Sequence, residues 1–185
     1  LWLSAALLLI SVVHGQVVNV TIFTESQCPY CTRLLREQIW PFYVTRPGIM
    51  NLQLILLRSR VVTDYQQNID RNRLIINDEI VTNDMTTCSY FQYFPRRHFG
   101  LLTCVQGLAT LREAFSRCLS RLSVRTQRRL IECATTQTGE LLSYYSMVNT
   151  HRTGVRVWPT VYVNGVYFDR SYPMETKICQ ETYWC

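Results

Sequence analysis

The motif Cys28-Pro29-Tyr30-Cys31, placed between a β-branched run and an amphipathic segment, constrains the fold of this chain more than any other feature. The run Val17–Thr24 is typical of a strand, and a proline just after the first cysteine suits the first turn of a helix. We expect that helix to continue toward Val44, with a kink or an end at Pro41. Because Leu52–Leu57 predicts a second buried strand, this region indicates a β-α-β unit with parallel strands.

The middle of the chain, from about Asp64 to Met147, has a different character. It carries helical periodicity, few strand signals and one proline, which predicts a mostly helical insertion. The clearest helical stretch is Leu111–Cys133, in which four apolar side chains are expected on one side: Phe115, Cys118, Leu119 and Leu122.

The sheet is expected to resume after the insertion. Val155–Val163 predicts a strand, Asn164-Gly165 a hairpin turn, and Val166–Phe168 the returning strand. A chain of 185 residues, 48% of them hydrophobic, can bury a sizeable core as one domain. We therefore predict an α/β domain over residues 16–185, with a helical insertion at about 64–150.

The spacing of Cys28 and Cys31 predicts thiol chemistry. At a helix N-terminus the free N–H groups and the partial positive charge stabilise a thiolate, which is the species that attacks disulfides. Cys28 comes first after the strand and is expected to be the exposed nucleophile, whereas Cys31, one turn further, should be partly buried and resolve the mixed disulfide. Pro29 fixes the turn and Tyr30 adds bulk beside the sulfur.

Two other interpretations of the motif stay open. A zinc site needs two further ligands, but the chain has only three histidines and no second CxxC, so we predict no metal. A static structural disulfide between the two cysteines is the other alternative.

Several segments around this motif resemble the gamma-interferon-inducible lysosomal thiol reductase (GILT) family. That resemblance implies a thioredoxin-like fold with a helical insertion, and Cys28 and Cys31 as a redox pair that reduces protein disulfides. The matching segments are Asn19-Val20-Thr21, the redox motif, a P-x-V-x-V-N-G stretch at Pro159–Gly165, a Cys-Gln at 179–180, and cysteines at 88, 104, 118 and 133.

The dipeptide Trp158-Pro159 agrees with a thioredoxin-like fold. Proline removes a ladder donor, so it belongs at a strand start, an edge or a special peptide bond. The resemblance implies a cis-proline opposite the CxxC, just before the third core strand, where the backbone of the preceding residue can pair with a bound substrate. An ordinary trans proline at a sheet edge is the alternative.

The chain departs from the hallmark of the family, CQHGxxECxxNxxxxC. If the last cysteine of that pattern is placed on Cys88, Asn83 and Glu79 match, but Arg73–Ile76 and Ile80 do not. The CQHG element and two cysteines are lost together, as the loss of a mutually paired disulfide would give. We therefore expect a divergent member of the family.

Six cysteines remain outside the redox motif, and an even remainder predicts three structural disulfides, each contributing ~2–4 kcal/mol. Fifteen connectivities are possible for six cysteines. Cys179 with Cys185 is a local candidate pair, and the other four would staple the insertion; free thiols are the alternative. The six are Cys88, Cys104, Cys118, Cys133, Cys179 and Cys185.

The first segment indicates a secretory route. Leu1–Val13 is apolar and uncharged but short for a membrane span, and small residues before Gln16 suit signal cleavage, so residues 1–15 are predicted to be a signal peptide whose start is missing. A buried strand or a membrane anchor is the alternative. No later segment predicts a transmembrane span. Asn19 begins an N-glycosylation sequon.

The chain has a net charge of +6, and some of its basic residues form two clusters in the sequence. They predict either a patch for an acidic substrate, glycan or anionic membrane, or a solvated helix face. No motif supports nucleic-acid binding. The clusters are Arg117, Arg121, Arg125, Arg128 and Arg129, spaced at first as on one helix face, and Arg96-Arg97-His98.

Together these features predict a secreted or lysosomal thiol-disulfide oxidoreductase that reduces protein disulfides. Pro159 and Trp158 would help to seat the substrate, beside Pro29 and Tyr30. No cofactor is expected beyond an external small thiol or dithiol that restores the pair. A disulfide oxidase or isomerase, and a disulfide-stabilised binding protein with an inert CxxC, are the alternatives.

Overall fold

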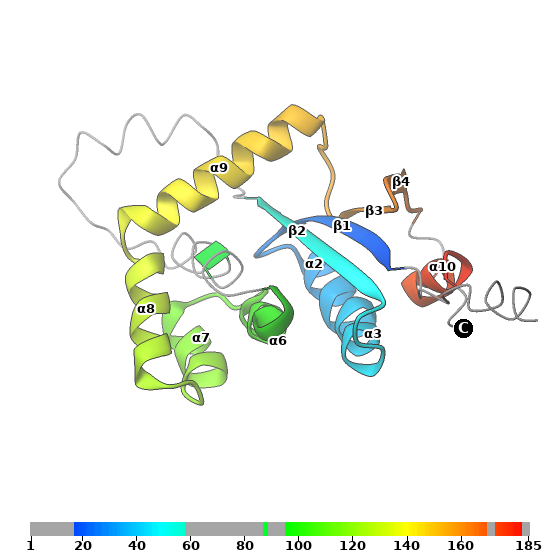
Figure 1. Cartoon of the computed structure of the whole chain (residues 1–185). Helices are drawn as coiled ribbons and strands as arrows, with labels where there is room; N and C mark the ends of the chain where they lie inside the picture. The colour runs from blue at the N-terminus through cyan, green and yellow to red at the C-terminus, as the bar shows by residue number, and fades with distance from the viewer. Residues whose placement is uncertain (1–16, 58–86, 89–94, 170–172, 183–185) are drawn as a thin grey trace, which may run out of the picture.

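The computed structural model describes residues 17–57, 87–88, 95–169 and 173–182 (Figure 1). The predicted signal peptide, the start of the helical insertion and the family hallmark region ahead of residue 87 lie outside these residues. The insertion boundaries therefore stay predictions. Within the part described, no helix is both long enough and apolar enough to cross a membrane.

A four-stranded sheet forms the centre of the fold, with the order β2-β1-β3-β4. β1 (Val18–Glu25) and β2 (Met50–Leu57) run parallel, which confirms the β-α-β unit. β3 (Thr160–Val163) pairs antiparallel with β1, and β4 (Val166–Tyr167) pairs antiparallel with β3. Thr160 lies opposite Phe23, so the third strand begins beside the end of β1 that carries the redox motif.

The third strand is shorter than the sequence predicts. Val155–Pro159 is not a strand, because a proline cannot donate to the ladder and pairing with β1 starts only at Thr160. The hairpin turn is confirmed: Asn164 and Gly165 have φ values of 49° and 79°, the left-handed pair that a two-residue turn requires.

The helix after the redox motif continues past Pro41. It consists of α2 (Pro29–Arg33), a π-helical turn η1 (Leu34–Ile39) and α3 (Trp40–Thr45). The Trp40 N–H bonds to the carbonyl of Leu35, five residues back. The helix therefore shifts its register just ahead of the proline and does not end there.

The main core lies between the sheet and this helix. Val20 and Ile22 of β1 and Leu35 and Ile39 of η1 are fully buried, because the strand turns every second side chain toward the helix. Helix α10 (Met174–Gln180) adds Met174 and Ile178 to the same cluster.

The helical part of the chain forms a second core. Its described helices are α6 (Pro95–Val105), α7 (Leu111–Ala114), η2 (Phe115–Leu119, π-helical), α8 (Val124–Ala134) and α9 (Gln137–Thr153). In the view of Figure 1, α9 lies above the sheet, while α2 and α3 lie below it. The Ser146 hydroxyl of α9 hydrogen-bonds to the carbonyl of Leu56 at the end of β2, which ties this helix to the sheet.

The expected continuous helix over Leu111–Cys133 is wrong. The chain turns at residues 120–123, and the Ser123 hydroxyl accepts a hydrogen bond from the Thr126 N–H at 3.2 Å to begin α8. Phe115, which the sequence places on the same side as Leu119, is 39% exposed, whereas Leu119 is fully buried.

Disulfides staple the helical segment. Cys88 pairs with Cys133, and Cys104 pairs with Cys118. Cys179 is also disulfide-bonded, but Cys185, its expected partner, lies outside the described residues, so that pairing stays a prediction.

Candidate redox site

The redox motif begins where β1 ends. Cys28 is the N-cap of α2, with extended backbone, and its sulfur accepts a hydrogen bond from the Cys31 N–H at 3.3 Å. Pro29 occupies the first helical position, where its missing N–H costs nothing. The two cysteines are the free thiols among the described residues. A hydrogen bond from a helix-terminal N–H stabilises a thiolate, so the geometry favours Cys28 as the nucleophile.

Burial separates the two sulfurs. Cys28 is 9% exposed and Cys31 is fully buried, so Cys28 is less open than the sequence predicts, although it remains the accessible one of the pair. Burial, followed by the hydrogen bond with Cys28, raises the pKa of Cys31 to about 12. The Glu25 backbone and the Thr24 hydroxyl act in the opposite direction. Cys31 is therefore protonated at neutral and acidic pH.

Trp158 lies against Cys28, although the two residues are 130 positions apart. The Cys28 thiol donates to the Trp158 carbonyl with a sulfur–oxygen distance of 3.9 Å, and the Trp158–Pro159 peptide bond is cis. Pro159 is buried and Trp158 is partly exposed. Tyr30 is 68% exposed on the first turn of α2. The fold thus brings the Trp158 carbonyl beside the Cys28 sulfur, and a substrate-seating role for Trp158, Pro159, Pro29 and Tyr30 stays a prediction.

The comparison with protein families decides the family. The model of the gamma-interferon-inducible lysosomal thiol reductase family matches residues 19–122, which include β1 from its second residue, the redox motif and the Cys104–Cys118 disulfide. The chain belongs to the GILT family. A gamma-interferon-inducible lysosomal thiol reductase from Carassius auratus is 24% identical over 155 residues. That alignment covers 82% of this chain but 61% of the relative, so this chain matches less than two thirds of the length of that relative.

Solved structures resemble this GILT family member in fold. A DsbA from Chlamydia trachomatis superposes with a TM-score of 0.62 at 13% identity, covering 90% of this chain and 87% of that one. Oxidised BdbD from Bacillus subtilis gives 0.63 at 13% identity, with 89% and 86% covered. MdbA, a thiol-disulfide oxidoreductase from Actinomyces oris, gives 0.64 at 8% identity, with 88% and 79% covered. The α/β, thioredoxin-like fold is thereby confirmed.

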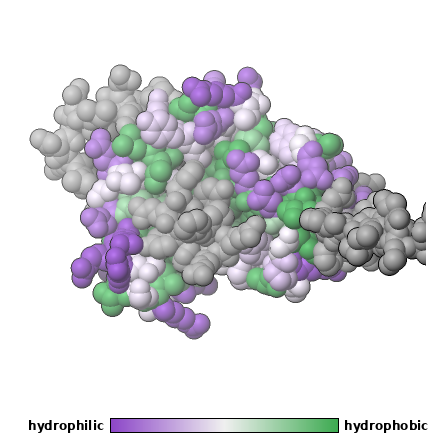
Figure 2. Space-filling view, in the orientation of Figure 1, coloured by the Kyte–Doolittle hydropathy of each residue, from purple (hydrophilic) through white to green (hydrophobic). Residues whose placement is uncertain are grey.

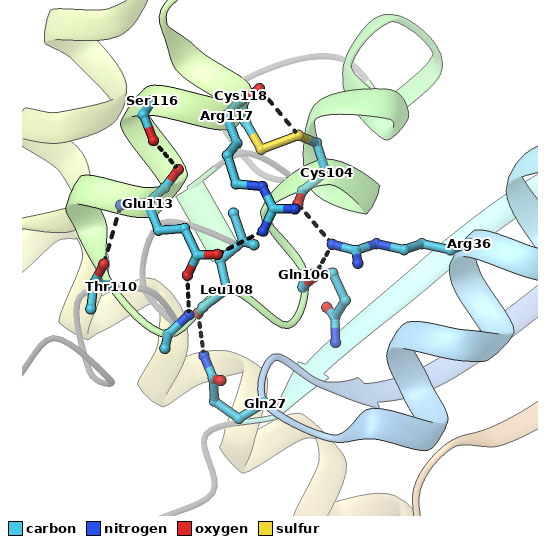
Figure 3. A network of polar contacts seen from close by, with 11 residues as sticks. Gln27, Arg36, Cys104, Gln106, Leu108, Thr110, Glu113, Ser116, Arg117 and Cys118 are labelled. Carbon is cyan, nitrogen blue, oxygen red and sulfur yellow. Dashed lines mark hydrogen bonds and ion pairs between the residues drawn. A yellow bond between two sulfur atoms is a disulfide. The ribbon is translucent and has the colours of Figure 1, made fainter.

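Sequence reasoning missed the residues that pack behind the redox motif. Gln106 and Gly107 hydrogen-bond to backbone carbonyls of the redox loop. Arg36 hydrogen-bonds to backbone carbonyls at the end of α6 (Figure 3). No local pattern could have indicated them, because Gln106 is about 80 residues from the carbonyls that it contacts.

Asn19, the predicted glycosylation site, lies at the opposite end of β1 from the redox motif. Its side chain is exposed, and its Oδ1 accepts a hydrogen bond from Asn51 Nδ2 at 2.9 Å. Glycosylation of Asn19 stays a prediction. Across the described ranges, no group of three or more His, Cys, Asp or Glu side chains is arranged to hold a metal ion.

The expected run of arginines on one helix face is wrong. Arg117 belongs to η2, Arg121 to the following turn and Arg125 to α8, so their i, i+4 spacing does not follow one helix. Arg117 forms an ion pair with Glu113 at 2.6 Å. The side chains are exposed, and Figure 2 shows hydrophilic groups projecting around α7 and the start of α8. The side chains of the Arg96-Arg97-His98 cluster lie outside the description.

Proposed function

We propose that this protein is a thiol-disulfide oxidoreductase that reduces protein disulfides through Cys28 and Cys31. The observation that carries the proposal is the pair of free thiols at the start of α2, in which the sulfur of Cys28 receives the Cys31 N–H at 3.3 Å. Its placement on a thioredoxin-like fold in a GILT family chain supports the same activity.

The first step is attack by the Cys28 thiolate on one sulfur of the substrate disulfide. The substrate S–S bond breaks, its other sulfur leaves as a thiolate and takes up a proton, and a mixed disulfide with Cys28 forms. In the second step Cys31 gives up its proton and attacks the Cys28 sulfur, which releases the second substrate thiol. Two electrons pass to the substrate, and the Cys28–Cys31 disulfide remains.

The raised pKa of Cys31 supports this order of steps. A protonated, buried Cys31 cannot attack the substrate first, and it reacts only once the mixed disulfide is beside it. An external small thiol or dithiol then returns two electrons to the pair. The proposed reaction needs no other cofactor.

The surface beside Cys28 is proposed to hold the substrate. The Trp158 carbonyl lies next to the sulfur, the Tyr30 side chain is exposed, and Pro29 adjoins Cys28 in the chain. An extended peptide at this point would place its disulfide against Cys28, with Pro159 fixing the backbone of the Trp158 segment.

The proposed location is the secretory pathway, as a secreted or lysosomal protein, because the Carassius auratus relative is named a lysosomal thiol reductase and Leu1–Val13 is apolar. The direction of the redox reaction depends on the reduction potential of the pair. An oxidase or isomerase would use the same two cysteines at a more oxidising potential.

Insulin reduction and thiol trapping test the proposal together. Wild-type protein should reduce insulin in the presence of a dithiol, and iodoacetamide at pH 5 should label Cys28 after mild reduction. Cys28→Ser should abolish insulin reduction, whereas Cys31→Ser should still attack and accumulate the mixed disulfide. If Cys28→Ser reduced insulin as fast as the wild type, the assignment would fail, and an unreactive Cys28 in a folded protein would favour a binding protein with an inert CxxC.

A further inference from the structure

The side chain of Gln106 is fully buried behind the redox loop, and both of its Nε2 contacts are to backbone carbonyls of that loop. Nε2 lies 2.6 Å from the Glu25 carbonyl oxygen and 3.1 Å from that of Ser26. Because both partners are acceptors, the NH₂ group must face them. The Oε1 atom is buried without a hydrogen-bond partner, so this orientation carries a cost that the two Nε2 contacts must offset.

One of these carbonyls also holds the nucleophile. The Glu25 oxygen accepts a hydrogen bond from the Cys28 N–H at 3.3 Å, in addition to the one from Gln106. The Ser26 oxygen accepts a second hydrogen bond, at 2.8 Å, from the Gly107 N–H. Gln106 therefore holds the carbonyls of Glu25 and Ser26, and the Cys28 N–H is hydrogen-bonded to the first of these two carbonyls.

The backbone carbonyl of Gln106 accepts a hydrogen bond from the helix that carries the redox pair. The Arg36 guanidinium, on η1, donates to the carbonyls at the end of α6 (Figure 3). The distances are 3.1 Å to Thr103, 3.0 Å to Cys104 and 2.6 Å to Gln106. Because Arg36 lies on the same helix as Cys31, the contacts form a closed circuit. This circuit consists of three sets of hydrogen bonds: from Arg36 to the carbonyls at the end of α6, from Gln106 to the carbonyls of the loop, and from the Cys28 N–H to the Glu25 carbonyl.

We propose that Gln106 is a positioning residue for the redox pair. It holds the carbonyls of Glu25 and Ser26, and so keeps the sulfur of Cys28 within hydrogen-bond distance of the Cys31 N–H. The inference rests on the proposed function and adds to it a residue of the helical segment. Without the Gln106 amide, the Glu25 carbonyl loses its 2.6 Å contact and the loop can shift. The N–H to sulfur bond then lengthens and the Cys28 thiolate is less stabilised.

The test replaces Gln106 by methionine, which has a similar shape but no donor. Gln127 supplies a matched control in the same helical segment, because its Nε2 also contacts two carbonyls, those of Leu122 at 2.8 Å and Ser120 at 3.4 Å, away from the redox loop. Two properties of Cys28 are measured for each variant: the rate of iodoacetamide alkylation across pH, and the equilibrium constant of the Cys28–Cys31 disulfide with glutathione. Circular dichroism verifies the fold.

Gln106→Met should lower the alkylation rate of Cys28 at acidic and neutral pH roughly threefold to tenfold, as expected for one weakened hydrogen bond to the thiolate. The glutathione equilibrium should shift by a similar factor toward the disulfide form, because the reduced form loses the stabilisation. Gln127→Met should leave both values within about twofold, since a general loss of stability does not change a local thiolate contact.

A folded Gln106→Met protein with the alkylation rate and glutathione equilibrium of the wild type would overturn the inference. If Gln106→Met does not fold, Arg36→Gln tests the same circuit from its exposed end, and unchanged values there would overturn it equally. Neither measurement requires turnover of a protein substrate. A wild type that fails to reduce insulin would therefore refute the proposed reductase activity, whereas the effect of Gln106 on Cys28 is decided separately.

Discussion

Gly107 offers a sharp test of how tightly the redox helix packs. It has φ +80°, and a Cβ built there would lie 2.8 Å from Thr32 Oγ1 and 3.0 Å from Thr32 Cγ2. The Thr32 hydroxyl donates to the Cys28 carbonyl at 3.1 Å, so it cannot turn away without losing that bond. Gly107→Ala should therefore both strain the backbone and push against the helix that carries the two cysteines.

The expected cost has two parts. A left-handed backbone costs a residue with a Cβ about 1–2 kcal/mol. Overpacking a close contact adds about 1–3 kcal/mol, so Gly107→Ala should lower the free energy of unfolding by roughly 2–5 kcal/mol in total. Gly154 isolates the first part, because it has φ +73° and no atom lies within 4 Å of its built Cβ.

Urea denaturation at pH 7, with the structural disulfides intact, measures the difference. Gly107→Ala should lose about 1–3 kcal/mol more stability than Gly154→Ala, and adding Thr32→Ala should recover much of that excess because the blocking atoms are removed. Equal losses for the two glycine variants, or no recovery in the double variant, would refute the argument that Thr32 is held firmly against this position.

Two further predictions concern Cys31 and the structural disulfides. The free energy of unfolding of the dithiol form should fall by about 1 kcal/mol from pH 8 to pH 10 relative to Cys31→Ala. The folded pKa of Cys31 is about 12 against 9.0 for an ordinary thiol, so this stability is complete below pH 9 and is lost as the pH rises toward 12; urea titrations that show no difference would contradict it. Replacing the Cys88–Cys133 bridge by alanines should cost about 4 kcal/mol and the Cys104–Cys118 bridge about 3 kcal/mol, because the bridged residues are 45 and 14 positions apart. Thermal unfolding of the two double variants measures this order, and its reversal would argue against chain entropy as the main cause.

The local sequence pattern and the structure differ in two helical regions, one around Pro41 and one over Leu111–Cys133. A proline in a helix predicts a kink or an end, and of these the end is absent at Pro41, where the π turn before it gives the Trp40 N–H the carbonyl of Leu35. Leu111–Cys133 has continuous helical periodicity, yet it forms two separate helical segments. Cys118 in the first segment is bridged to Cys104, and Ser123 caps the start of the second. Periodicity reports which residues favour burial and does not locate a break between two helices.

The sequence by itself determined the elements whose signals lie within a few residues. These include β1, the helix start after Cys28, and the Asn164-Gly165 turn. It also predicted Cys28 and Cys31 as the redox pair, since the thiol spacing and the helix N-terminus are both local properties.

Only the tertiary structure decided which groups surround that pair. Cys31 is fully buried, the Trp158 carbonyl lies at 3.9 Å from the Cys28 sulfur, and Gln106 holds the carbonyls of the loop. The pairing of the cysteines in the helical segment was equally undetermined, because six cysteines allow 15 connectivities and only the approach of two backbones selects one. Hydrogen bonds, disulfides and burial depend on distances between segments that are far apart in the chain, and no local pattern of residues encodes those distances.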